Sequence, residues 1–261
     1  MKHNSRTFYH FLKLQDVKAF KVSDFEDYFE NEYNKVYGII NVLIKNQAIT
    51  KLKNGFYAVN PLPGDPTLPS WHLIAEALVQ PKDYYIAFAS ALQIHELTTQ
   101  PVHKEYIVTK DRILPKKQYL NKIEYEIINL SFHKFFGFQK TWISNYDKVY
   151  ASTVEKTIID CIAFPQHAGG IEAIIRAIDM AKEKIKPNVL VDFALRYKTQ
   201  SVMKRLGFLL EHLNLFAVEQ SILHQSISAA YTKLDPSIKT SGKFHRKWRI
   251  EDNVNIHELK E

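Results

Sequence analysis

The sequence predicts a mixed α/β fold of the α+β type, with a small N-terminal domain and a larger remainder. Three observations lead to this expectation. Apolar residues recur at helical spacing in several segments, as they do along residues 171–178. Short β-branched and aromatic segments lie together between residues 105 and 153, bounded by helical patterns on both sides. Residues 60–69 contain four prolines and one glycine, which exclude a helix or a central strand and predict a stiff linker.

The linker sets the domain boundaries. We expect an N-terminal domain at 1–60, a linker at 61–70 and a larger domain at 71–261. The 261 residues carry a formal net charge of +7, which favours an acidic partner, most commonly nucleic acid. An AT-rich genome would also produce such a lysine excess without any polyanionic partner.

The composition points to the cytoplasm. Cys161 is the one cysteine, so a disulfide framework is excluded and a reducing compartment is expected. The first twenty residues are basic but lack the continuous apolar core of a signal peptide. No apolar run approaches the length that spans a membrane, so we expect no membrane partner.

Two helices are predicted in the N-terminal domain. Ser23 and Glu26 have the spacing of a capping box, which predicts a short helix through Phe29. The next helix begins near Asn31, and its expected buried stripe consists of Val36, Ile40, Leu43 and Ile44. The opposite face is polar and consists of Asn34, Gly38, Asn41 and Lys45, with Asn31 and Lys35 beside the first turns. Asparagine pairs with adenine edges and lysine with guanine or phosphate, so this face suits a DNA major groove.

A basic hairpin is predicted to follow the second helix. Asn54-Gly55 is a strong hairpin signal, because a type I′ turn needs positive φ at both positions. Lys51 and Lys53 flank the turn, where they would meet phosphates. Two short helices and a basic hairpin are the order expected of a winged helix-turn-helix. The DNA-binding residues predicted from this geometry are Asn31, Asn34, Lys35, Asn41, Lys45, Lys51, Lys53 and Asn54. A winged helix that contacts protein, or serves only as scaffold, is the alternative.

The larger domain is predicted to alternate helices and strands. Ser70 caps a helix over 71–79 that Pro81 ends, and a second helix is expected from Asp83 to Leu97. Strands are expected in 105–110, 125–130, 134–143, 148–153 and 247–251. Further helices are expected from Thr153, and in 171–185, 189–198, 201–213 and 219–231.

Several segments of the larger domain resemble one family. YYIAFASALQIHELTTQ (Tyr84–Gln100), followed by YIVTK, resembles the start of the main domain of AbiEi-type antitoxins, the transcriptional regulators of viral defence systems. STVEKTIIDCIAFPQHAGGIEAIIRAI (Ser152–Ile178) is similar to that family's segment with Glu-Lys-Thr, a later Asp and Pro, and Gly-Gly. VMKRLGFLLEHL and GKFHRKWRI are similar to later family features, and all matches occur in family order.

The resemblance implies the antitoxin of a type IV toxin–antitoxin pair. In that family the winged helix binds repeats in the promoter of its own operon and represses it. The larger domain counters a nucleotidyltransferase-like toxin without a stable complex, and some members lack an evident toxin gene. The C-terminal basic cluster offers a second DNA surface, made of Lys243, His245, Arg246, Lys247 and Arg249. A solvated strand edge explains the same residues and is favoured.

The search for an active site predicts no catalytic residue, no metal and no cofactor. His95-Glu96 begins like a zinc-protease motif, but Thr99 stands where the second histidine should be. Gly169-Gly170 precedes a predicted helix whose N-terminus could bind a phosphate. A phosphate-binding loop would continue with Lys and Ser or Thr, which are absent, so two glycines here are more typical of a connection between two helices. The Gly-Ser and paired aspartates of a nucleotidyltransferase are absent from the sequence. The rival hypothesis is a degenerate nucleotidyltransferase- or nuclease-like enzyme that carries a DNA-binding domain.

Glu155, Lys156 and Asp160 form a charged group on one predicted helix. The functional hypothesis is a patch that meets the toxin, its RNA substrate or DNA. Local pairing, with Lys156 and Asp160 at (i, i+4), is the simpler alternative and is favoured. Cys161 lies on the apolar face of this helix, which favours a small core residue over a nucleophile.

Overall fold

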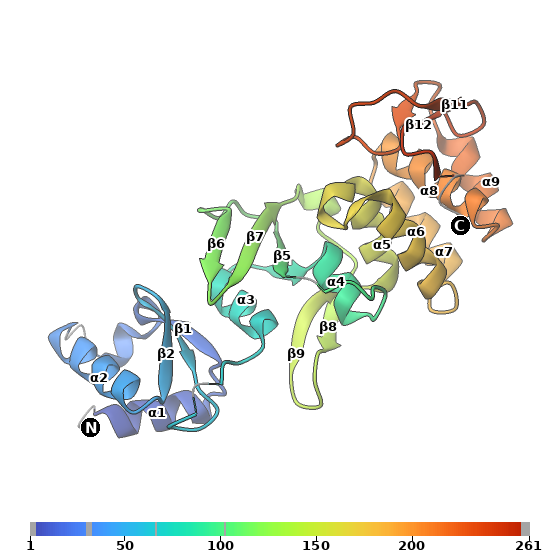
Figure 1. Ribbon diagram of the computed structural model, residues 1–261. Helices are drawn as coiled ribbons and strands as arrows, with labels where there is room; N and C mark the ends of the chain where they lie inside the picture. Colours follow the sequence, from blue (N-terminus) through green and yellow to red (C-terminus); the bar gives the residue numbers. More distant parts are fainter. Residues whose placement is uncertain (1–3, 30–32, 66, 102, 257–261) are drawn as a thin grey trace. The chain divides into compact units, whose positions relative to one another are not determined.

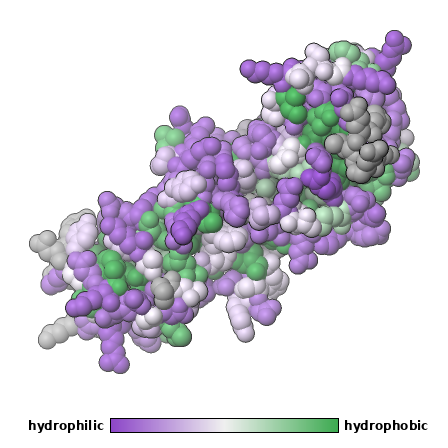
Figure 2. Space-filling model, in the orientation of Figure 1, coloured by the Kyte–Doolittle hydropathy of each residue, from purple (hydrophilic) through white to green (hydrophobic). Residues whose placement is uncertain are grey.

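The chain folds as an α+β protein, shown by a computed structural model that describes residues 4–29, 33–65, 67–101 and 103–256 (Figure 1). Contacts divide it into two compact units. The first contains Met1–Tyr84 and Ile113–Glu126, and the second contains Tyr85–Arg112 and Ile127–Glu261. The expected division at 1–60, 61–70 and 71–261 remains a prediction about independent folding. Hydrophilic residues cover most of the face in Figure 2, where apolar residues gather in small patches.

The first unit begins with the element order of a winged helix. Its elements are α1 (Ser5–Leu14), β1 (Ala19–Lys21), η1 (Val22–Phe25), η2 (Asp27–Phe29), α2 (Tyr33–Lys45), β2 (Ile49–Lys53) and β3 (Phe56–Val59). The three strands form an antiparallel sheet in the order β1–β3–β2. The predicted order of a helix followed by a hairpin is present in α2, β2 and β3, while the winged helix-turn-helix as a DNA-binding domain stays a prediction.

An aromatic cluster holds the helices of this unit on the sheet. The ring of Phe8, fully buried on α1, has its centroid 4.7 Å from that of Phe29 and 5.8 Å from that of Phe20. Phe25 and Tyr28 also lie within 5.4 Å of Phe8. Edge-to-face pairs of this kind add to the gain from burial. The buried stripe of α2 consists of Val36, Ile39, Ile40 and Leu43. Ile39 is therefore a core residue that the prediction omitted, and Ile44 is only partly buried.

The predicted helix at Ser23 is a pair of short 3₁₀ turns, so its capping box is wrong. Asp24, and not Ser23, performs the capping role, because its carboxylate accepts a hydrogen bond of 2.8 Å from the backbone N–H of Lys21. The aromatic cluster explains the difference. Turns of 3₁₀ type bring Phe25 and Phe29 onto Phe8 and Phe20 without a regular helix.

The β2–β3 hairpin forms as predicted, but its turn does not. Gly55 has φ 73°, whereas Asn54 is not among the described residues with positive φ, so a type I′ turn is excluded. The register shifts between Lys51 and Lys53, which pair with Tyr57 and Phe56. The irregular pairing next to the turn replaces the regular two-residue type I′ geometry, and of the two turn residues only Gly55 has the left-handed conformation.

The proline-rich segment leads into α3 (Trp71–Val79). Asn60, which precedes the segment, is fully buried and donates to the carbonyl of Gln47 at 2.8 Å. Ser70 caps α3 as predicted, since its hydroxyl accepts from the backbone N–H of His72 at 3.4 Å. Pro66 lies outside the described residues.

The second unit contains the largest helical layer. Its elements are β4 (Tyr84–Ile86), α4 (Phe88–Ile94), β5 (Lys104–Thr109), η3 (Phe132–Lys134), β8 (Phe138–Trp142), β9 (Lys148–Ser152), α5 (Val154–Ala163), η4 (Pro165–His167), α6 (Gly170–Ala181), α7 (Pro187–Arg196), α8 (Gln200–His212), α9 (Ala217–Ser226), β10 (Thr232–Lys233), β11 (Lys243–His245) and β12 (Ile250–Asp252). Between β5 and η3 the chain forms the hairpin of β6 (Lys117–Leu120) and β7 (Ile123–Asn129), of which the residues up to Glu126 belong to the first unit. The strands form a sheet of order β6–β7–β5–β4–β9–β8 and a small sheet of order β10–β12–β11.

Four predictions for this part of the chain are wrong in whole or in part. The strand expected at 134–143 begins only at Phe138, and the helix expected at 219–231 ends at Ser226. The helix expected from Asp83 is interrupted, because Tyr84–Ile86 form strand β4 and the helix begins at Phe88. All three strand residues are buried, and aromatic and β-branched side chains suit an interior strand. The strand expected at 247–251 begins only at Ile250, because residues 246–249 turn the chain and Arg249 has φ 53°. None of the described helices is long and apolar enough to cross a membrane.

Candidate nucleic-acid interface

The polar face of α2 is exposed where the structure describes it. Lys35, Asn41 and Lys45 are exposed, and Gly38 lies between them with no atom near the position of a Cβ. Tyr37 and Val42 are also exposed, at 58% and 44%. The exposed side of the helix therefore offers hydrogen-bond donors, a glycine that permits close approach, and two apolar side chains. Groups of these kinds contact base edges and phosphates in protein–DNA complexes.

Two residues of the predicted set cannot be placed. Asn31 lies outside the described residues. Asn34 belongs to the backbone of α2, and its side chain lies outside what the structure describes.

The hairpin places two lysines in different surroundings. Lys51 is exposed on β2, and Asn54 is exposed in the turn. The ammonium group of Lys53 donates to the side-chain oxygen of Gln118 on β6 and lies 5.7 Å from the ring centroid of Phe56. Burial, and next the charge of Lys21, lower the pKa of Lys53. Lys51 is thus the better placed of the two to contact phosphate.

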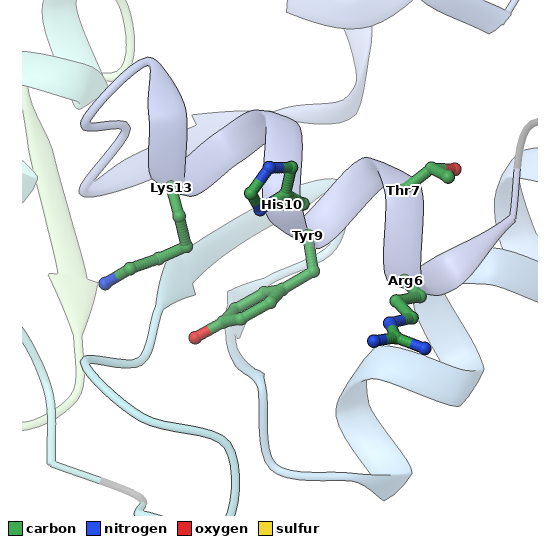
Figure 3. A pocket seen from close by; sticks show the side chains of 5 residues that line it. All are labelled: Arg6, Thr7, Tyr9, His10 and Lys13. Carbon is green, nitrogen blue, oxygen red and sulfur yellow. The ribbon is translucent and has the colours of Figure 1, made fainter.

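A pocket of about 430 Å³ lies along α1, away from the predicted residues. Figure 3 shows its five lining side chains, all from this helix: Arg6, Thr7, Tyr9, His10 and Lys13. Two of these are already used inside the unit, because Tyr9 donates to the carbonyl of Asn60 at 3.2 Å and Lys13 to that of Pro61 at 3.1 Å. These two hydrogen bonds give Tyr9 and Lys13 a structural role, in tying α1 to the start of the linker.

The C-terminal basic residues lie on the β11–β12 hairpin of the second unit. Lys243, Arg246 and Lys247 are exposed, and Arg249 and His245 are partly buried. Lys247 pairs with Glu211 of α8, whose carboxylate also accepts from Trp248 Nε1 at 2.9 Å. This pairing ties part of the cluster to its own fold, as the strand-edge interpretation expects. Lys243 and Arg246 remain as exposed cations.

The charged group on α5 forms a buried cluster and not a surface patch. Lys156 and Asp160 are fully buried and form an ion pair. The ammonium group of Lys156 also donates to the hydroxyl of Tyr85 at 2.9 Å, and that hydroxyl donates to Asp160 at 3.1 Å. Glu155 is 7% exposed, and its carboxylate accepts from the backbone N–H of Lys186 at 3.0 Å. The hypothesis that this group meets a toxin or a nucleic acid is therefore wrong.

Burial controls the protonation of this cluster. It raises the pKa of Asp160 and lowers that of Lys156, because water solvates neither charge, while the partner's opposite charge works against both shifts. It also raises the pKa of Tyr85 and of Tyr197, so both phenols stay protonated. The ammonium group lies 5.1–5.2 Å from the ring centroids of Tyr85, Phe136 and Tyr197. The cluster is a structural ion pair in an aromatic cage.

The other residues considered for catalysis have structural surroundings. His95 is the C-cap of α4, and its Nε2 bonds the carbonyl of Ser152 at 2.6 Å. Cys161 is fully buried, which raises the pKa of its thiol. Gly169 and Gly170 open α6 with φ 88° and 87°, a conformation that favours glycine. Within the described ranges no three His, Cys, Asp or Glu side chains gather as metal ligands.

Comparison with known proteins supports the fold. No protein-family model matches the chain, and no curated protein matches it. Among solved structures, it is similar to the crystal structure of the Rv2827c protein from Mycobacterium tuberculosis. The two share 13% sequence identity and a TM-score of 0.69, over 97% of this chain and 92% of that one. The matched residues include both units, so the likeness concerns the fold of each.

Proposed function

We propose that this protein is a DNA-binding transcriptional repressor that reads its operator with α2 and the β2–β3 hairpin. The observation that carries the proposal is the exposed row of Lys35, Asn41 and Lys45 on the helix that a winged helix inserts into the major groove. Lys51 and Asn54 on the hairpin extend that surface toward the phosphates. The net charge of +7 agrees with a polyanionic partner.

The repressor acts, in this proposal, as the antitoxin of a type IV toxin–antitoxin system. It represses its own operon through promoter repeats, and the larger domain counters a nucleotidyltransferase-like toxin without a stable complex. It works in the cytoplasm, where its operator lies. The support for this part is the ordered set of segments that resemble AbiEi-type antitoxins.

Gel-shift titration of the full chain with the DNA upstream of its own gene tests the repressor. Binding should be much tighter to that DNA than to a random duplex of equal length at moderate salt, because base contacts add to the phosphate term. Equal affinity for both duplexes would remove the repressor from consideration. Replacement of Asn34, Lys35, Lys51 and Lys53 by Ala separates a DNA reader from a protein-contact module, since only the reader loses DNA affinity.

The antitoxin role has its own test. Co-expression with a nucleotidyltransferase-like toxin encoded beside this gene should restore growth, and a chain limited to residues 71–261 should retain part of the rescue. Toxicity that persists with the full chain present would reject the antitoxin role while leaving the repressor intact.

A further inference from the structure

The β8–β9 hairpin of the second unit carries a ladder of lysines and aromatic residues on one face. Cross-strand pairing sets Lys140 opposite Tyr150 and Trp142 opposite Lys148. Residues two apart in a strand share a face, so these four side chains lie together. The ammonium group of Lys148 is 4.0 Å from the ring centroid of Trp142, and that of Lys140 is 5.6 Å from the ring of Tyr150.

This face is exposed although its base is anchored in the core. Trp142 is 57% exposed, Tyr150 36%, and Tyr146 at the turn 90%. At the base, Phe138 stacks on Tyr85 with ring centroids 5.0 Å apart and planes at 11°. Figure 1 shows the hairpin extending away from the helices of its unit. The base of the hairpin is therefore held in the core while its outer part presents large aromatic rings to solvent, and such clustered exposure favours a binding surface.

The charge of the arm favours a polyanion. Residues 138–152 contain two exposed lysines on the aromatic face and a single acidic residue, Asp147. Asp147 lies at the turn, where its carboxylate accepts from the hydroxyl of Ser144 at 3.1 Å. Protein interfaces are enriched in aromatic residues but depleted in lysine, whereas alternating lysines and rings suit phosphates and bases.

We propose that this face binds single-stranded nucleic acid. Trp142 and Tyr150 are spaced along the ladder as platforms on which unpaired bases stack. The ammonium groups of Lys140 and Lys148 lie over one face of these rings, and in the complex these flexible side chains turn outward to contact the phosphates. Duplex DNA keeps its bases stacked inside, so it cannot use the rings in this way. The site shares no residue with α2 or with the set assigned to operator binding.

Fluorescence anisotropy tests the site with the full chain and labelled 12-nucleotide probes of mixed sequence. The probes are single-stranded RNA, single-stranded DNA, and a duplex unrelated to the upstream DNA. At least one single strand should bind more tightly than the duplex. Trp142→Leu and Tyr150→Leu should each weaken single-strand binding by about tenfold, the loss of one stacked base. Replacing Lys140 and Lys148 together by Gln should reduce the salt slope by about 1.4.

Two controls isolate the ladder. Gln139→Ala alters an exposed residue on the opposite face of β8 and should leave single-strand binding unchanged. Lys35→Ala with Lys45→Ala should also leave it unchanged, although operator binding falls. Urea unfolding of each variant confirms that it is folded.

Tryptophan fluorescence gives an independent reading in the unaltered protein. Of the three tryptophans, Trp142 is exposed and Trp248 is 1% exposed, so stacking on Trp142 should quench emission. Trp142→Phe should keep most of the affinity and lose the quench.

The proposal is overturned if the duplex binds as tightly as either single strand, or if Trp142→Leu binds like the wild type.

Discussion

The exposed lysines of α2 and the buried Lys156 of α5 show that the same residue type has different roles in different surroundings. Lys35 and Lys45 are exposed in the first unit, at the protein surface where water and salt screen charge. Lys156 is fully buried in the second unit, beside Asp160 and Tyr85. There, its charge is needed to compensate a carboxylate that water cannot reach. In the proposed function the first kind of lysine serves binding, and the burial of Lys156 makes the second kind part of the core.

The largest effect should come from breaking the buried pair. Lys156→Met leaves Asp160 without its cation, and we expect the free energy of unfolding to fall by about 3–5 kcal/mol. Urea denaturation followed by circular dichroism measures the loss. Lys156→Met with Asp160→Leu should recover much of it, because neither charge then remains buried. A single variant within about 0.5 kcal/mol of the wild type would contradict the structural role.

The second effect should appear in binding and leave stability intact. Lys35→Ala with Lys45→Ala should weaken operator binding and reduce the salt slope by about 0.9 for each lost phosphate contact. The free energy of unfolding should change by less than about 0.5 kcal/mol, because both side chains are exposed. Gel shifts at several salt concentrations, paired with urea denaturation, check both halves. An unchanged slope would mean that α2 does not face phosphate.

A smaller difference should separate the two hairpin lysines. Lys51→Ala should weaken DNA binding more than Lys53→Ala, because Lys53 already donates to Gln118 and must give up that bond to reach a phosphate. Gln118→Ala frees Lys53 without touching the hairpin and is the matched control. Equal losses for both lysines would show that the bond to Gln118 does not restrain Lys53.

The smallest effect should be a pH dependence near His95. Burial lowers its pKa from the usual 6.5, so the folded protein holds this ring neutral more firmly than the unfolded chain does. The contribution of His95 to stability is present above about pH 6.5 and is lost as the pH falls from 6.5 through the lowered folded pKa. Urea unfolding between pH 5 and 8 should show this loss in the wild type relative to His95→Gln. Parallel profiles for the two proteins would argue against it.

Local patterns in the sequence determined most elements and part of the candidate site. The apolar spacing of α2 identified its exposed polar face, because a helix with one buried stripe must turn its other side to water. Asn54-Gly55 located the hairpin, and Thr153 and Ser70 marked where α5 and α3 begin. Each of these signals acts within a few residues, which is the range over which backbone conformation and capping are decided.

The contacts between residues that are distant in the sequence were decided by the tertiary structure alone. Lys156 and Asp160 look like a surface pair along the helix, and only packing against Tyr85, 71 residues away from Lys156, buries them. Tyr84–Ile86 continue a helical pattern in sequence, yet pairing of Ile86 with Ala151 makes them a strand. In the sequence Lys53 resembles Lys51, and only the folded structure shows its hydrogen bond to Gln118 on another hairpin. Burial and strand pairing depend on contacts across the fold, and such contacts leave no local periodicity to read.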